Sequence, residues 1–170
     1  ELLEQDPNAP FLGNPDGDVT VVELYGYNCP YCRRAMSEVE GLIRAHPNVR
    51  LVVREWPILG DGLVFAAKAA LAVRNQDKYE EFHRALMGIE ERAQEASVLR
   101  AAEETGLDVD QLRSDMEAPE VQWHIDESMR LAQALDFNGR PSFVIGDNLV
   151  AGLVEQDQLE ALVDEAREMG

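Results

Sequence analysis

The chain has 170 residues, of which 45% are hydrophobic and 28% are charged. Its 33 acidic and 15 basic residues give a net charge of −18, and its pI is about 4.4. This length and composition predict one domain, or one domain with an insertion, around a substantial core. The acidic surface excludes nucleic acid and anionic lipid as partners. No apolar run approaches the roughly 20 residues that a membrane-spanning helix needs, so we expect no membrane insertion.

The N-terminal third predicts a βαβ unit. Residues 1–18 contain three prolines and two glycines and predict an extended, turn-rich lead-in. Residues 19–25 are apolar and β-branched, which predicts a buried strand. A helix is predicted from the cysteines to about His46, and residues 48–56 predict a second strand. A strand, a helix and a strand of these lengths favour a parallel strand pair.

The next segment, residues 60–137, predicts helices. Apolar residues recur at helical spacing over residues 63–71, 79–86 and 121–135, and the third helix is expected to end at Asn138-Gly139. Ser97 and Asp108 are predicted N-caps, and Gly106 is a predicted helix stop. His83 shares an apolar face, which predicts a core or boundary position, and both tryptophans, Trp56 and Trp123, are predicted packing residues. Residues 140–152 then predict a β-hairpin, and residues 159–166 predict a last helix.

The only two cysteines of the chain form one motif, Cys29-Pro30-Tyr31-Cys32. A Cys-x-x-Cys at a strand-to-helix junction is typical of a redox-active dithiol. The alternatives are half of a zinc site and a small structural disulfide. A zinc site needs about four ligands, and the sequence has neither a second cysteine pair nor histidines at ligand spacing. A bridge across two residues closes too short a loop to stabilise a fold much, so the pattern favours redox chemistry.

Four stretches carry a resemblance to a known family: residues 6–15, 22–32, 79–87 and 141–146. With the order βαβ, helical block, ββα, the chain resembles the DsbA family of bacterial thiol–disulfide oxidoreductases. It is similar to the Com1-like branch, which includes the suppressor of copper sensitivity protein C. The resemblance implies an α/β thioredoxin fold with an inserted helical subdomain. Residues 19–59 and 138–170 would form the thioredoxin-fold domain, residues 60–137 the inserted subdomain, and residues 1–18 the lead-in.

The residues of the motif have distinct expected roles. Cys29 would lie at a helix N-terminus, where unpaired N–H groups and the helix dipole favour a thiolate, so it is the predicted nucleophile. Cys32 follows one turn later, which suits disulfide geometry, and is the predicted resolving thiol. Pro30 and Tyr31 set the environment of the pair.

Three further residues are expected to support the site. Pro141 resembles the family's cis-proline that packs against the dithiol. The residue before it, Arg140, departs from the family's small or β-branched residue, and is either a cation that lowers the pKa of Cys29 or a solvated surface arginine. Glu23 occupies the place of the family's buried acid beneath the dithiol, where it would relay protons to Cys32; otherwise it is a surface glutamate.

The expected function is exchange of disulfides with cysteine-containing proteins in the bacterial periplasm, without a cofactor. A membrane redox partner would recycle the dithiol. One alternative is a disulfide isomerase or reductase that a membrane partner keeps reduced. Such an isomerase would be a homo-oligomer formed through a segment ahead of Glu1. The sequence contains no recognisable signal peptide, and a mature protein whose signal peptide had been removed would look the same. The other alternative is a Cu(I)-binding protein that uses Cys29 and Cys32, since thiolates select that ion.

Overall fold

The computed structural model describes residues 10–27, 30–56, 61–89, 92–137, 141–152 and 154–169. Its strands are β1 (Phe11–Gly13), β2 (Val19–Tyr25), β3 (Val49–Glu55), β4 (Ser142–Ile145) and β5 (Asn148–Ala151). Its helices are α1 (Pro30–Ala45), α2 (Asp61–Ala72), the 3₁₀ helix η1 (Val73–Gln76), α3 (Tyr79–Met87), α4 (Glu95–Glu104), α5 (Val109–Asp115), α6 (Pro119–Ala134) and α7 (Gln156–Met169).

The described strands form one mixed sheet in the order β1-β3-β2-β4-β5. Strands β2 and β3 are parallel, with Val19 opposite Val49 and Tyr25 opposite Glu55, and α1 connects them. Strand β4 runs antiparallel to β2 and forms a hairpin with β5. The predicted βαβ unit, the hairpin and the last helix are therefore confirmed.

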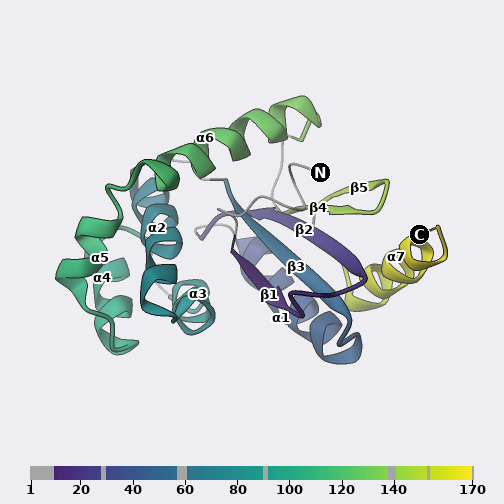
Figure 1. Ribbon diagram of the computed structural model, residues 1–170, viewed down its shortest axis with the longest axis horizontal. Coiled ribbons are helices and arrows are strands. Elements are labelled where there is room, and N and C mark those ends of the chain that lie inside the picture. Colours follow the sequence, from purple (N-terminus) through teal and green to yellow (C-terminus); the bar gives the residue numbers. More distant parts are fainter. Residues whose placement is uncertain are drawn as a thin grey trace.

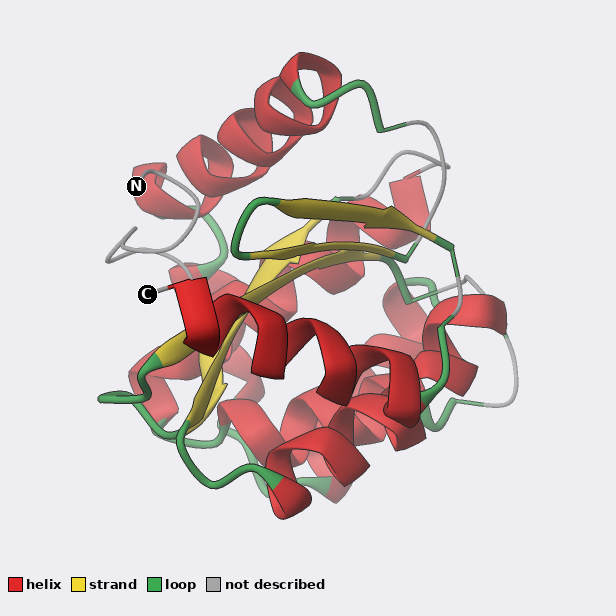
Figure 2. Cartoon of the chain, turned by 90° about the vertical axis from the view of Figure 1, so that its right-hand side faces the viewer, coloured by secondary structure: helices red, strands yellow, loops and turns green. Residues whose placement is uncertain are grey.

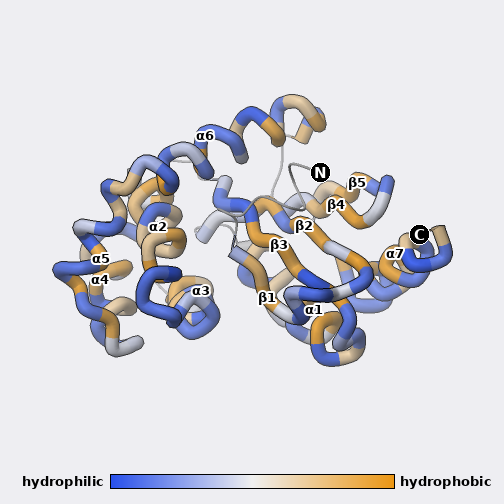
Figure 3. The backbone as a smooth tube through the Cα atoms, in the orientation of Figure 1, coloured by the Kyte–Doolittle hydropathy of each residue, from blue (hydrophilic) through white to orange (hydrophobic). Residues whose placement is uncertain are grey.

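The two faces of the sheet are covered by different helices. Helices α1 and α7 pack on the face that carries Val21, Leu51 and Phe143. The other face, with Val22 and Val52, is covered by the C-terminal half of α6. Figure 2 shows the sheet between α7 and α6, and Figure 3 shows the apolar colouring of β2 and β3. Burial on both faces explains why these two strands are nearly continuous apolar runs.

Helices α2 to α5 form a group beside the sheet, and α6 reaches from this group across to the sheet (Figure 1). The N-terminal half of α6 places Val121 and Ile125 against Ala67 and Leu71 of α2. Phe82 of α3 is fully buried in the main core, which also includes residues of the sheet. None of the described helices is both long and apolar enough to span a bilayer.

Two local predictions near chain turns need correction. The segment predicted as a lead-in contains β1, which pairs antiparallel with β3 and extends the sheet. This pairing was not predicted because a three-residue strand after a proline gives no alternating pattern. Ser97 is not the N-cap of α4; it is the third helical residue, and its Oγ accepts the N–H of the N-cap residue Gln94 at 2.9 Å. Asp108 is confirmed as the N-cap of α5.

The predicted end of α6 and one tryptophan also differ. Helix α6 ends at Ala134, because Asp136 adopts a left-handed conformation (φ 59°) and the N–H of Phe137 bonds the carbonyl of Ala132 at 2.9 Å. The predicted stop at residues 138–139 lies outside the described residues. Trp123 is 45% exposed, so its predicted packing role is wrong. Trp56 is buried against β2 and α6, as predicted.

Candidate active site

The cysteine motif lies where β2 leads into α1. Cys32, in the first turn of α1, is fully buried, whereas Tyr31 beside it is 56% exposed. The guanidinium of Arg34 lies 5.8 Å from the centre of the Tyr31 ring, within the range of a cation–π contact. Cys29 lies outside the described residues, and so does the side chain of Pro30. The described half of the motif therefore consists of a buried thiol and an exposed aromatic ring.

Arg33 fixes the start of α1 to two other elements. Its Nε donates a hydrogen bond to the carbonyl of Tyr27 at 2.9 Å. Its guanidinium also donates to the carbonyl of Ile89, just after α3. Hydrogen bonds from a charged donor are stronger than neutral ones. The position of Cys32 is therefore coupled to the helices beside the sheet.

Pro141 lies at the same end of the sheet as the motif. Ser142 of β4 pairs with Leu24 of β2, so the register carries Pro141 to the level of Tyr25, the last residue before the motif's loop. Pro141 is buried, and its carbonyl accepts the N–H of Gly152 at 2.8 Å. Arg140, and with it the peptide bond before Pro141, lies outside the described residues. The cis bond and the charge effect of Arg140 remain predictions.

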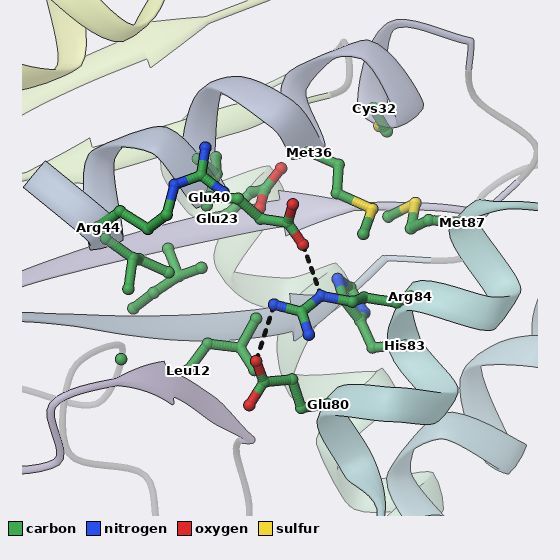
Figure 4. A pocket seen from close by; sticks show the side chains of 14 residues that line it. Leu12, Glu23, Cys32, Met36, Glu40, Arg44, Glu80, His83, Arg84 and Met87 are labelled. Atoms are coloured by element: carbon green, nitrogen blue, oxygen red, sulfur yellow. Dashed lines mark hydrogen bonds and ion pairs between the residues drawn. The ribbon is translucent and has the colours of Figure 1, made fainter. Parts of the chain in front are cut away.

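Glu23 is buried within the sheet rather than on its surface. Only 5% of the residue is exposed, and its neighbours in register are Val53 and Phe143. It lines a cavity of about 220 Å³ together with the buried Cys32 (Figure 4). The alternative of a surface glutamate is therefore excluded. The proton relay from Glu23 to Cys32 remains a prediction.

This cavity lies between α1, α3 and the first three strands. Apolar side chains, among them Met36 and Met87, form part of its lining. In Figure 4 the sulfur atoms of these methionines point toward each other. Arg84 of α3 joins Glu40 of α1 at 2.7 Å and Glu80 of its own helix at 2.9 Å. This ion pair links α3 to α1 along the cavity.

Next to the cavity lies a buried group of polar side chains, which we call the tyrosine–glutamate cluster: Tyr25, Tyr27, Glu55, Tyr79 and His83. The hydroxyls of Tyr25 and Tyr27 donate to Oε1 of Glu55 at 2.5 and 3.0 Å and lie 2.7 Å apart. Nδ1 of His83 lies 3.2 and 3.1 Å from the same hydroxyls. Tyr79 lies 3.2 Å from the hydroxyl of Tyr25. His83 also lines the cavity.

Burial dominates the titration of this cluster. It raises the pKa of Glu55 to about 8, although hydrogen bonds from Tyr25 and Tyr27 act in the opposite direction. Burial also lowers the pKa of His83 to about 4, with a smaller contribution from Arg84. At neutral pH the cluster therefore holds a protonated glutamic acid and a neutral histidine.

Sequence reasoning placed His83 in the core but missed the cluster. Its members are up to 58 residues apart in the chain, as between Tyr25 and His83. The sequence contained a signal, because the apolar run of β3 ends in two charged residues, Arg54 and Glu55. The structure buries both of them. Charged residues are almost never fully buried unless they are paired. A charged pair directly after an apolar run, at the end of a strand beside the motif, marks a candidate functional group.

A mixed sheet with a Cys-x-x-Cys sequence where its first parallel strand leads into a long helix is the arrangement of the thioredoxin fold. Residues 20–164 match the model of the DSBA-like thioredoxin domain family, and the chain belongs to that family. The resemblance found in the sequence and the DsbA-like thioredoxin fold are thereby confirmed.

Solved structures agree with this assignment. A thioredoxin-like oxidoreductase from Silicibacter pomeroyi DSS-3 is 67% identical, with a TM-score of 0.95 over 96% of this chain and 94% of that one. The catalytic domain of Proteus mirabilis ScsC is 27% identical, with a TM-score of 0.88 over 98% of this chain and 93% of that one. The second likeness agrees with the branch that the sequence resembles.

Similarity to curated proteins extends to much longer chains. The Na(+)/H(+) antiporter NhaA 3 of Salinispora tropica is 29% identical over 165 residues, which are 95% of this chain and 25% of the antiporter. The chain thus spans about a quarter of the length of the first curated relatives that it matches.

Proposed function

We propose that this protein exchanges disulfides with cysteine-containing proteins through Cys29 and Cys32. The observation that carries the proposal is the buried position of Cys32 in the first turn of α1, in the same cavity as the buried carboxyl of Glu23. Burial protects the sulfur of Cys32 from attack by substrates, which suits the resolving role and leaves Cys29 as the proposed nucleophile. Pro141 at the same end of the sheet adds the support expected of the family.

The exchange proceeds in two steps. A substrate thiolate attacks Sγ of Cys29 in the oxidised pair, the Cys29–Cys32 bond breaks, and its electron pair remains on the sulfur of Cys32. That sulfur takes up a proton, for which Glu23 is the proposed donor. A second substrate thiolate then attacks the substrate sulfur of the mixed disulfide, and Cys29 leaves as a thiolate. The substrate is oxidised to a disulfide and the enzyme is reduced to the dithiol.

The helix terminus makes Cys29 a good leaving group. The first N–H groups of an α-helix have no partners within the helix, and the helix dipole places partial positive charge there. Both effects lower the pKa of a thiol at this position. The motif's Tyr31 and Pro30 and the charge of Arg140 would adjust the stability of the thiolate, and thereby the direction of exchange. We expect an intermediate to oxidising redox potential.

We further propose a periplasmic location and a membrane protein that restores the redox state of the pair. This proposal is supported by family membership and by the likeness to a periplasmic thioredoxin-like protein of Salmonella enterica serovar Typhimurium, which is 28% identical with a TM-score of 0.83. Whether the partner oxidises or reduces the dithiol decides between a disulfide donor and an isomerase or reductase.

Trapping the mixed disulfide tests the assigned roles. In Cys32→Ser the resolving sulfur is absent, so Cys29 should stay bound to a substrate cysteine. The intact protein should then show a mass increase equal to the mass of the substrate under non-reducing conditions. Cys29→Ser should trap nothing. Ser37→Ala, an exposed change on the same helix, is the matched control and should behave as the unmodified protein. Equal trapping by both cysteine variants would contradict the assignment.

One observation favours a second candidate, Cu(I) binding by Cys29 and Cys32. The thioethers of Met36 and Met87 line the same cavity as Cys32 (Figure 4), and soft sulfur ligands select Cu(I). Competition for Cu(I) with a chelator of known affinity tests this function. A Cu(I) protein should lose binding in Cys29→Ser and bind more weakly in Met36→Leu and Met87→Leu. Equal binding by all variants would exclude it.

A further inference from the structure

A hydrogen bond encloses the cysteine motif. Nε of Arg33 donates to the carbonyl of Tyr27 at 2.9 Å. Arg33 directly follows Cys32, and the other end of the bond lies two residues before Cys29. The bond therefore closes a short loop that contains both cysteines. The guanidinium of Arg33 also donates to the carbonyl of Ile89 after α3, which fastens this loop to a third segment.

Tyr27 is anchored through its side chain as well. The residue is fully buried, and its hydroxyl donates to Oε1 of Glu55 at 3.0 Å. The same hydroxyl lies 2.7 Å from that of Tyr25 and 3.1 Å from Nδ1 of His83. The ring packs edge-on against the rings of these two residues, with centroids 5.2 and 5.8 Å away. Tyr27 thus ties the segment ahead of the motif to β2, β3 and α3.

These contacts are suited to hold the loop in both redox states. Hydrogen bonds from a charged donor are about twice as strong as neutral ones, and a buried network of bonded polar groups makes the local structure rigid. The bonds of Arg33 and Tyr27 use no sulfur atom, so opening the disulfide removes none of them. The two ends of the loop therefore stay together when the dithiol is reduced.

We propose that Arg33 and Tyr27 form a clamp that sets the redox equilibrium of the dithiol by holding the two ends of the motif in place. This inference rests on the proposed exchange function. A dithiol in an ordered loop loses less conformational entropy when its disulfide forms, so the clamp favours the disulfide. In glutathione buffer the dithiol is oxidised to the disulfide while one glutathione disulfide is reduced to two thiols. Both clamp residues are positioning residues that act through the backbone of the motif.

Two substitutions of Arg33 separate the clamp from the charge. Arg33→Lys keeps the positive charge but lacks the planar fork that bonds both carbonyls. Without the clamp the reduced loop gains the freedom of about one residue, so the disulfide should be disfavoured by about tenfold relative to the unmodified protein. Arg33→Met, which has neither the fork nor the charge, should show the same shift. A shift in Arg33→Met alone would show that the charge acts rather than the clamp, and would overturn the inference.

The test measures the equilibrium constant with glutathione at about pH 7, by thiol alkylation and mass. Arg113→Lys is the matched control, because it also gives up a guanidinium hydrogen bond, to Glu95 at 2.9 Å, but on α5, which lies apart from α1 (Figure 1). It should follow the unmodified protein.

Urea unfolding of both redox forms separates positioning from ordinary stabilisation. In Arg33→Lys the folding equilibrium constant of the oxidised form should fall about tenfold further than that of the reduced form, because the two measurements are linked in one thermodynamic cycle. A bond that stabilises both forms equally leaves the glutathione equilibrium unchanged. That result for Arg33→Lys would overturn the inference.

Tyr27→Phe tests the clamp from its other end and decides the matter if Arg33→Lys fails to fold. It removes the hydroxyl and keeps the buried ring, so the equilibrium should again shift toward the dithiol. Tyr79→Phe removes another hydroxyl of the same cluster, 3.2 Å from that of Tyr25, but from α3 rather than from the loop, and should shift the equilibrium less. Equal shifts in the two variants, or no shift in Tyr27→Phe, would overturn the inference.

The clamp and the exchange function fail in different ways. If the unmodified protein shows no reversible dithiol–disulfide transition, the exchange function itself fails. If it shows one that Arg33→Lys and Tyr27→Phe leave unmoved, only the clamp fails.

Discussion

The protonated state of Glu55 has a consequence for folding that is independent of redox chemistry. The pKa of Glu55 is about 8 in the folded protein, against 4.5 for an ordinary glutamate. Between these values the folded state binds more protons than the unfolded state. The free energy of unfolding must therefore fall as the pH rises through this range. Replacement of Glu55 by glutamine removes the titrating group and with it this loss of stability.

The magnitude follows from the two pKa values. From about pH 6 to about pH 9, deprotonation of Glu55 should lower the free energy of unfolding by about 3 kcal/mol, which is the equivalent of about two pKa units. This is a large part of the stability of a typical domain. His83 works in the other direction, because its pKa of about 4 lies below the ordinary value of 6.5, so its contribution is lost as the pH falls below about 6.5. Glu55→Gln retains His83, so the difference between the two proteins isolates Glu55.

Urea unfolding of the oxidised protein at several pH values is the assay, because the cysteines of the oxidised protein do not titrate. The stability of the unmodified protein relative to Glu55→Gln should decline by about 3 kcal/mol from about pH 6 to about pH 9. Glu103→Gln, the same change at an exposed position on α4, is the control and should give a flat difference. A flat difference for Glu55→Gln as well would mean that Glu55 is already ionised at pH 6, which would refute the reasoning from burial.

Three other changes have expected outcomes. Phe82→Ala empties a fully buried position and should lower the free energy of urea unfolding by about 3–5 kcal/mol; a loss below about 1 kcal/mol would contradict the packing. Asp136→Gly relieves a left-handed residue (φ 59°) and should raise the same quantity by about 0.5–1 kcal/mol, whereas a decrease would contradict the strain. Arg140→Thr should raise the pKa of the Cys29 thiol, read from thiolate absorbance; an unchanged curve would show that Arg140 does not act on it.

The order of the elements was predictable because the relevant signals are local. The apolar run at 19–25, the cysteine motif before a helix and the hairpin at 140–152 are each contained in one short stretch of sequence. The N-cap at Asp108 was found for the same reason. Strand β1 was missed because its stability comes from pairing with β3, about 40 positions away, rather than from its own three residues.

The site was only half predictable. The motif identified Cys29 and Cys32, and the resemblance to the family predicted Glu23 as a buried acid beneath them. The other members of the tyrosine–glutamate cluster come from β2, its following loop and α3, and they meet only after the helices have packed on the sheet. Trp123 shows the opposite error, because an aromatic residue on an amphipathic helix was expected to pack and is 45% exposed.

The most direct measurement is the redox equilibrium of the Cys29–Cys32 pair in glutathione buffers at pH 7, read by alkylation and mass. The proposed exchange function predicts a reversible two-electron transition at an intermediate to oxidising potential, lost in Cys29→Ala. A pair that never forms the disulfide would contradict the function and favour metal binding. A pair that stays oxidised in strongly reducing buffers would contradict the disulfide-donor role and indicate a reductase or a structural bridge.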